Sequence, residues 1–127
     1  MTYAGLRHIL DTRMTLDTTI REAKKGTGEL VVLALLERRA RHGYELVKLI
    51  EERSGGALTF NFASLYATLY KLEERRFVRG RWVERPNQRR RRYYRITAAG
   101  REVLAAQRRE WRAFFELVRD LAGLSHA

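Results

Sequence analysis

Hydrophobic residues along the chain fall into segments with helical spacing, separated by glycine-containing breaks. In residues 27–40 the apolar run from Leu30 to Leu36 leaves no polar face, which predicts a helix that is buried on nearly all sides. A buried strand is the alternative, but the length of the segment favours the helix. Residues 41–56 predict a second helix, because Gly43 marks a break, apolar residues recur with helical spacing, and a glycine pair ends the pattern.

A third helix is predicted over residues 62–76. Asn61 is a good N-cap for it, and Leu65, Leu69 and Leu72 recur at the spacing of a core-facing stripe. The opposite face carries two alanines, and such small side chains let a helix backbone approach a partner closely. This face consists of Ala63, Ala67, Tyr70 and Glu74, flanked by Ser64 and Lys71.

Residues 77–85 and 90–97 each alternate between two sets of side chains, which is typical of strands. Pro86, Asn87 and Gln88 lie between them and supply turn chemistry, so we expect a hairpin with an arginine-rich tip. On the first strand Val78, Gly80, Trp82 and Glu84 are expected on one side, and Arg79, Arg81, Val83 and Arg85 on the other.

A long final helix is predicted from the N-cap Thr97 to Gly123. Its side chains form two series that repeat every seven residues, and this seam is too apolar for a lone helix on a small domain. The pattern therefore predicts helix pairing between two subunits, a homodimer. The series contain Leu104, Trp111 and Val118, and Gln107, Phe114 and Leu121, with Phe115 in the same aromatic cluster.

The order helix, helix, helix, strand, strand, helix indicates a mainly α protein with a β-hairpin wing, a winged helix-turn-helix. We expect three parts. Residues 1–26 form an N-terminal extension that could hold a short helix, residues 27–97 form the DNA-binding domain, and residues 98–123 form the dimerisation helix.

The distribution of charge along the sequence indicates what kind of partner the protein binds. The 127 residues carry a net charge of +11. Between Lys71 and Arg95 there are eleven basic residues and three acidic ones, so +8 of that charge falls within 25 residues. Because neutralising phosphates releases counterions, this concentration predicts binding to nucleic acid.

The third helix is the candidate recognition helix. Its small-residue face could enter a major groove, which is about 12 Å wide. Ser64, Thr68, Tyr70 and Lys71 would then reach base edges or phosphates. An ordinary solvated face is the alternative, and the neighbouring hairpin favours contact with DNA.

The hairpin tip is the candidate wing. Arg89, Arg90, Arg91 and Arg92, with Tyr93 beside them, suit phosphates or a narrow minor groove, although a solubilising charge run is the alternative. Tyr44 opens the second helix, where a hydroxyl could meet a phosphate; a core tyrosine is the alternative.

Other function classes lack support. The chain has no cysteine, which excludes disulfides and thiolate metal sites. His8, His42 and His126 lack ligand spacing, so we expect no metal or other cofactor, and His42 is expected to pack or cap locally. No nucleophile motif, phosphate loop or acid–base set indicates an enzyme. The longest apolar run is too short for a membrane span and no signal peptide is evident, so we expect a cytoplasmic protein.

Two other functions fit the same fold. An architectural DNA-binding protein would use the basic surface without sequence preference. A protein-interaction adaptor would keep the fold without binding DNA, and the run of four arginines argues against it. The cluster of Trp111, Phe114 and Phe115 indicates dimer packing, and paired Trp111 side chains could also line a pocket for a planar aromatic effector.

Four stretches together resemble the PadR family of bacterial transcriptional regulators, from about Lys25 to Gly123. They are KGTGELVVLALL, HGYELVKLIEERSGGAL, SLYATLYKLEERRFVRGRW and RRRRYYRITAAGREVL. The single C-terminal helix looks like the small PadR subfamily. The resemblance implies a dimer, built by the last helix with help from the N-terminal segment, that binds a palindromic operator, usually as a repressor.

The resemblance also implies roles for single residues. Tyr44, Ser64, Tyr66, Tyr70 and the basic wing tip would face DNA or support that surface. Trp111 resembles a tryptophan that stacks on planar drugs in multidrug-sensing members. The family often has Gly-Thr-Leu-Tyr-Pro where this chain has the sequence Ala-Ser-Leu-Tyr-Ala at residues 63–67, so the third helix is expected to sit slightly differently.

Overall fold

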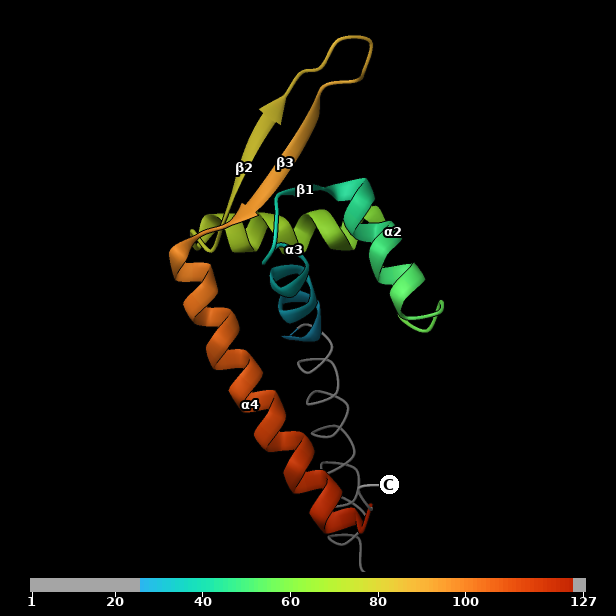
Figure 1. Cartoon of the computed structure of the whole chain (residues 1–127), viewed down its shortest axis with the longest axis vertical. Helices are drawn as coiled ribbons and strands as arrows, with labels where there is room; N and C mark the ends of the chain where they lie inside the picture. The colour runs from blue at the N-terminus through green and yellow to red at the C-terminus, as the bar shows by residue number, and fades with distance from the viewer. Residues whose placement is uncertain (1–25, 125–127) are drawn as a thin grey trace, which may run out of the picture.

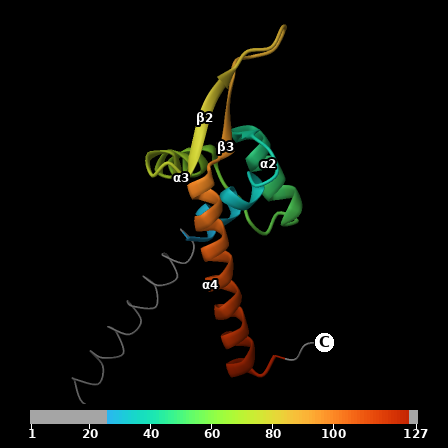
Figure 2. The same ribbon diagram turned by 60° about the vertical axis from the view of Figure 1, so that its left-hand side comes forward.

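The computed structural model of the chain describes residues 26–124. Residues 26–35 form the first helix. The elements that follow are β1 (Arg41–His42), α2 (Gly43–Arg53), α3 (Phe62–Glu74), β2 (Val78–Val83), β3 (Arg91–Ile96) and α4 (Ala98–Ala122). Figures 1 and 2 show the first three helices packed as a head, with the β2–β3 hairpin projecting from it. The predicted winged helix-turn-helix is confirmed.

Side-chain caps fix where the helices begin, as predicted. The Asn61 side chain accepts a hydrogen bond from the Ser64 backbone at 2.8 Å, and Thr97 accepts one from the Gly100 backbone at 3.0 Å. Each bond satisfies an N–H group that has no partner within its helix. His42 caps α2 in the same way, through the Glu45 backbone at 3.3 Å.

The first helix is shorter than predicted, because it ends at residue 35 and not at 40. The Arg41 side chain donates to the Leu35 carbonyl at 2.8 Å and pairs with Glu45 at 3.0 Å, which folds the intervening segment into a turn. After this turn β1 pairs with β3, so the hairpin becomes a three-stranded antiparallel sheet in the order β1-β3-β2. A two-residue strand is too short to show alternation, and sequence reasoning missed it.

A single core joins the helices to the inner face of the hairpin. The predicted stripe of α3 is confirmed, since Leu65, Leu69 and Leu72 are all buried. The rest of the core comes from the other elements: Val32, Leu33, Leu36, Leu46, Val78, Tyr94, Ile96 and Leu104.

The first half of α4 is fixed to the head. Gly100 lies against the Phe77 carbonyl so closely that a Cβ would overlap the backbone oxygen. Arg108 pairs with Glu37 through two contacts of 2.8 and 3.0 Å, and its guanidinium holds the pKa of Glu37 below the usual value. Leu104 is buried in the head, so its predicted place on the subunit seam is wrong.

Beyond this junction α4 runs away from the head, in the direction opposite to the hairpin (Figure 1). Its C-cap is Gly123, with φ 69°, a left-handed conformation that glycine adopts at little cost. Across residues 26–124, no helix has the length and apolarity to cross a membrane.

Candidate nucleic-acid interface

The side of α3 opposite the core is open to solvent. Ala63, Ser64, Ala67, Tyr70 and Lys71 are all exposed there, and Tyr70 has 69% of its surface free. The two alanines leave the helix backbone accessible between the larger side chains. This surface has the shape that a helix needs to enter the major groove.

Thr68 does not join this face. It is half-buried, and its hydroxyl donates to the Ser64 carbonyl at 3.0 Å within the helix. The same oxygen lies 3.9 Å from the position that a Cβ would take at Gly28, so Thr68 faces the first helix. The structure therefore separates Thr68 from the residues with which it was predicted to act.

A row of aromatic rings runs from α2 to α3. Tyr44 stacks on Phe62, with centroids 6.2 Å apart, and Phe62 stacks on Tyr66 at 6.5 Å. All three rings are about half exposed, so Tyr44 is not a core tyrosine. The Tyr66 hydroxyl lies 2.5 Å from where a Cβ at Gly43 would be, and the glycine thus makes room for it. Sequence reasoning missed Phe62, whose only signal is its place directly after the cap.

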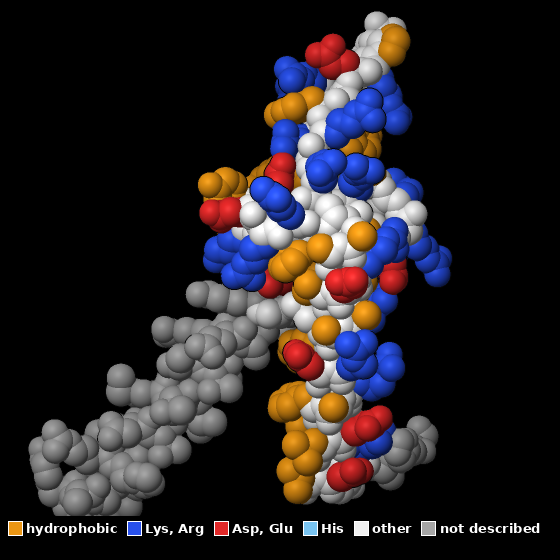
Figure 3. Space-filling view, turned by 90° about the vertical axis from the view of Figure 1, so that its left-hand side faces the viewer, with side chains coloured by type: hydrophobic (Ala, Val, Ile, Leu, Met, Phe, Trp, Pro, Cys, Tyr) orange, Lys and Arg blue, Asp and Glu red, His pale blue; other side chains and the backbone are white. Residues whose placement is uncertain are grey.

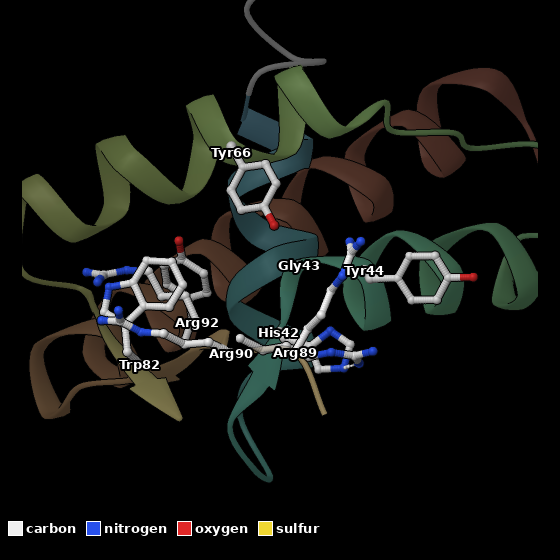
Figure 4. A pocket seen from close by; sticks show the side chains of 10 residues that line it. His42, Gly43, Tyr44, Tyr66, Trp82, Arg89, Arg90 and Arg92 are labelled. Atoms are coloured by element: carbon white, nitrogen blue, oxygen red, sulfur yellow. Dashed lines mark hydrogen bonds between the residues drawn. The ribbon is translucent and has the colours of Figure 1, made fainter. Parts of the chain in front are cut away.

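An open groove of about 530 Å³ separates this aromatic row from the hairpin (Figure 4). Tyr44 and Tyr66 line its helical side, and Trp82 lies on the hairpin side. All four arginines of the wing tip border the same groove. The predicted wing, Tyr44 of α2 and Tyr66 of α3 therefore meet at one place.

The four arginines of the wing tip differ in the contacts that their side chains make. Arg89 and Arg90 precede β3 and are exposed, and the Arg90 guanidinium lies 4.6 Å from the centre of the Trp82 ring. Arg92 forms an ion pair with Glu73 of α3 and lies over Gly80, where a Cβ would overlap it. Arg92 thus ties the hairpin to the recognition helix, whereas Arg89 forms no ion pair among the described residues and Arg90 forms only an exposed one, with Glu84 at 3.8 Å.

Arg91 also borders the groove, but its guanidinium contacts His42 and not α3. Its guanidinium lies 2.9 Å from Nε2 of His42, whose Nδ1 faces the Glu45 backbone N–H. Both neighbours are N–H donors, and an imidazolium has no acceptor to offer them. Burial lowers the pKa of His42, and the charge of Arg91 lowers it further. The neutral ring, which can accept from one of the two donors, is therefore favoured.

Tyr93, by contrast, does not line the groove. It contacts the His42 ring edge-on, with centroids 5.2 Å apart, and the Arg85 guanidinium lies 5.8 Å from its ring. Tyr93 borders a second hollow on the far side of the sheet. It is therefore not placed beside the residues of α3.

Trp82 belongs to the groove but was not among the predicted contact residues. It is 51% exposed, and the guanidinium groups of Arg90 and Arg92 lie 4.6 and 5.6 Å from the centre of its ring. Its signal in the sequence was an aromatic residue within an arginine-rich strand. Such a ring presents an apolar surface beside cations, a combination suited to the sugar–phosphate backbone.

The exposed seam of α4 forms a separate cluster. Trp111, Phe114 and Phe115 contact one another, with centroids between 5.5 and 6.2 Å apart. Val118 and Leu121 continue this exposed surface toward the end of the helix. Gln107 is half-buried, and its Oε1 has no hydrogen-bond partner within the described part of the chain.

The profile of the PadR-like family of transcriptional regulators matches residues 32–106. The chain belongs to this family. This PadR-like protein is 28% identical over 94 residues to an uncharacterised protein of Lysinibacillus sphaericus, across 74% of this chain and 86% of that protein. The predictions of a DNA-binding regulator and of a protein that is not an enzyme are confirmed by the family.

Solved structures agree with the fold. A transcriptional regulator from Thermoplasma acidophilum is 27% identical with a TM-score of 0.70, over 82% of this chain and 98% of that one. One from Clostridium thermocellum is 24% identical with a TM-score of 0.71, over 78% and 93%. Bacillus subtilis PadR in complex with operator DNA is 22% identical with a TM-score of 0.56, over 61% of this chain and 44% of that one.

Proposed function

We propose that this PadR-like regulator is a cytoplasmic homodimer that binds a palindromic operator and represses transcription. The observation that carries the proposal is the open groove in which Tyr66 of α3, the start of α2 and the wing arginines meet, together with the exposed face of α3. Residues 27–97 would read the DNA, and residues 98–123 would pair the subunits. The operator complex of Bacillus subtilis PadR supports this use of the shared fold.

The dimer is supported by the composition of the α4 surface. Phe114, Phe115 and Leu121 are more than half exposed along the second half of a 25-residue helix. Large contiguous apolar surfaces on soluble proteins mark interaction sites, and a helix stripe suits the same stripe of a second copy. The pairing would place two α3 helices in successive major grooves, about 34 Å apart.

An effector site is a second proposal, supported by the aromatic cluster around Trp111. Two such clusters would face each other in the dimer and offer flat apolar walls to a planar aromatic molecule. Binding there would change the spacing of the two heads. The population of DNA-competent dimers would shift accordingly.

The first test is binding to DNA from upstream of the chain's own gene, compared with scrambled DNA of equal length at about 150 mM salt. We expect saturable binding of one dimer, with a preference for the native fragment of about 10³ or more. Equal and salt-sensitive binding to both fragments would favour an architectural protein or an operator elsewhere. Absence of binding to either would favour the adaptor and contradict the proposal.

A further inference from the structure

The sheet has a second basic surface, on the side opposite the groove. We call it the far face. It surrounds a shallow hollow of about 440 Å³ and consists of Arg79, Arg81, Arg85 and Arg95, with Val83 and Tyr93 between them. Strand alternation places Arg79, Arg81 and Arg95 on the side of β2 and β3 opposite to Trp82 and Tyr94, which line the groove.

The far-face arginines are unusual because no acidic group of the described residues pairs with them. All four are exposed, and within residues 26–124 none forms an ion pair or a hydrogen bond with a side chain. No acidic residue lines the hollow. By contrast, Arg90 pairs with Glu84 and Arg92 with Glu73 on the groove side.

Strand register makes this arrangement costly. Arg79 lies directly opposite Arg95 in the β2–β3 ladder. Like charges that face each other across strands destabilise a sheet. A bound anion would remove the repulsion, so the surface is suited to a negatively charged partner.

The proposed operator complex does not use this charge. Four of the eleven basic residues between Lys71 and Arg95 lie on the far face, away from α3 and the groove. A duplex read by α3 lies on the other side of the sheet. The far face therefore needs a partner of its own.

The chemistry of the surface favours a nucleic acid over a protein. Protein interfaces depend on buried apolar and aromatic anchors, whereas here Val83 and Tyr93 are already half-buried between the arginines. Alternate residues of a strand lie about 7 Å apart, which is the spacing of Arg79 and Arg81 along β2, and Arg95 lies opposite Arg79 on β3, so cations extend along the hairpin. Such an arrangement matches the regular charges of a phosphate backbone.

We propose that the far face binds the phosphate backbone of a second DNA duplex, so that the dimer bridges two DNA segments. The inference rests on the proposed function, because the first duplex occupies the groove. The second contact reads no sequence, since phosphate contacts carry none. It would hold an operator close to another stretch of DNA.

The test is capture of one duplex by another. One duplex of random sequence is fixed to beads, a second carries a fluorophore, and the full chain is added. The far-face variant carries Arg79→Gln, Arg81→Gln and Arg95→Gln. A charge-matched control carries Arg53→Gln, Arg109→Gln and Arg112→Gln, which are exposed positions without an ion pair among the described residues.

We expect the wild type and the control to capture the labelled duplex, and the far-face variant to capture about tenfold less, as expected when phosphate contacts are lost. Binding of a single labelled duplex, followed by anisotropy, should change by no more than about twofold. Because Arg79 and Arg95 repel each other, the melting temperature of the variant should not fall. A single Arg81→Glu variant gives the same test without altering that pair.

If the far-face variants capture as much labelled duplex as the wild type, the proposal is overturned, and an acidic protein becomes the expected partner of the surface. Loss of single-duplex affinity, with a salt slope lower by about one per arginine removed, would also overturn it, because the arginines would then contact the same duplex. Failure of the wild type to bind even one duplex would instead contradict the proposed function.

Discussion

Two regions of the molecule expose large aromatic side chains, and the two regions differ in net charge. Around the groove, Tyr66 is exposed on α3, and Trp82 lies within the basic segment from Lys71 to Arg95, which holds eleven cations and three acids. Helix α4 has the same length as that segment and exposes Phe114 and Phe115, but it holds five arginines and four acids. In Figure 3 basic side chains follow the hairpin, whereas apolar side chains gather along lower α4.

The difference teaches how to interpret exposed apolar surface. Aromatic rings among excess cations suit a polyanion, since the rings pack on sugars while the cations meet phosphates. Aromatic rings in a charge-balanced helical stripe suit another protein helix, because burial of apolar surface is the main source of binding free energy there. The same residue types therefore point to DNA in one region and to a second subunit in the other.

Reversal of charge at the wing tip should have the largest effect. In the Arg89→Glu/Arg90→Glu variant the dimer loses four exposed cations, and we expect affinity for any duplex to fall about 1000-fold at about 150 mM salt. The salt dependence should also flatten. An Arg109→Glu/Arg112→Glu variant makes the same charge change on exposed positions of α4 and should retain most affinity. Anisotropy titrations across salt concentrations measure both, and an unchanged slope in the wing variant would contradict the assignment.

A charge within the α4 stripe should have the next largest effect. Phe115→Glu places a carboxylate on the surface proposed to pair the subunits, and burying it there is costly. We expect monomers in light scattering and about 100-fold weaker operator binding, because two linked heads lose their avidity. Ala105→Glu adds the same charge at an exposed position nearer the head and serves as the control. A Phe115→Glu protein that stays dimeric would exclude this face as the interface.

The junction between the two regions should tolerate change poorly. A methyl group at Gly100 would overlap the Phe77 carbonyl, which also accepts from the Thr97 backbone at 3.0 Å. We expect Gly100→Ala to lower the free energy of unfolding by about 2 kcal/mol, as overpacking does. Gly26→Ala, where a Cβ meets nothing within 4 Å, should be neutral or slightly stabilising. Urea denaturation of both variants measures the difference, and equal stability would show that α4 can shift at its base.

Features that depend on neighbours in the chain could be predicted from the sequence. The caps at Asn61 and Thr97 and the leucine stripe of α3 follow from spacing alone, because helix geometry fixes which residues meet. The alternation that separates the far face from the groove follows from strand geometry in the same way.

Features that depend on distant neighbours could not be predicted. Strand β1 exists because Arg41 and His42 meet β3, about fifty residues later in the chain. Arg92 is tied to Glu73, which the sequence of four arginines does not indicate. Leu104 shares the seven-residue repeat of the α4 seam but is buried in the head. The sequence could not show this, because the same helical periodicity is expected for a contact with the core and for a contact with a second subunit.

The smallest expected effect concerns the pH dependence of the wing base. The pKa of His42 is lower in the folded chain than its ordinary value of 6.5, first through burial and then through Arg91. The neutral ring therefore stabilises the fold fully above about pH 6.5, and that contribution is lost as pH falls from there toward the lower folded pKa. His42→Asn keeps a good N-cap but cannot titrate. Thermal melts between pH 7 and pH 5 should show a smaller decline for this variant than for the wild type, with His8 and His126 common to both. Parallel declines would mean that Arg91 moves away when the ring is protonated, and the wing would then be less firmly held to α2 than the groove requires.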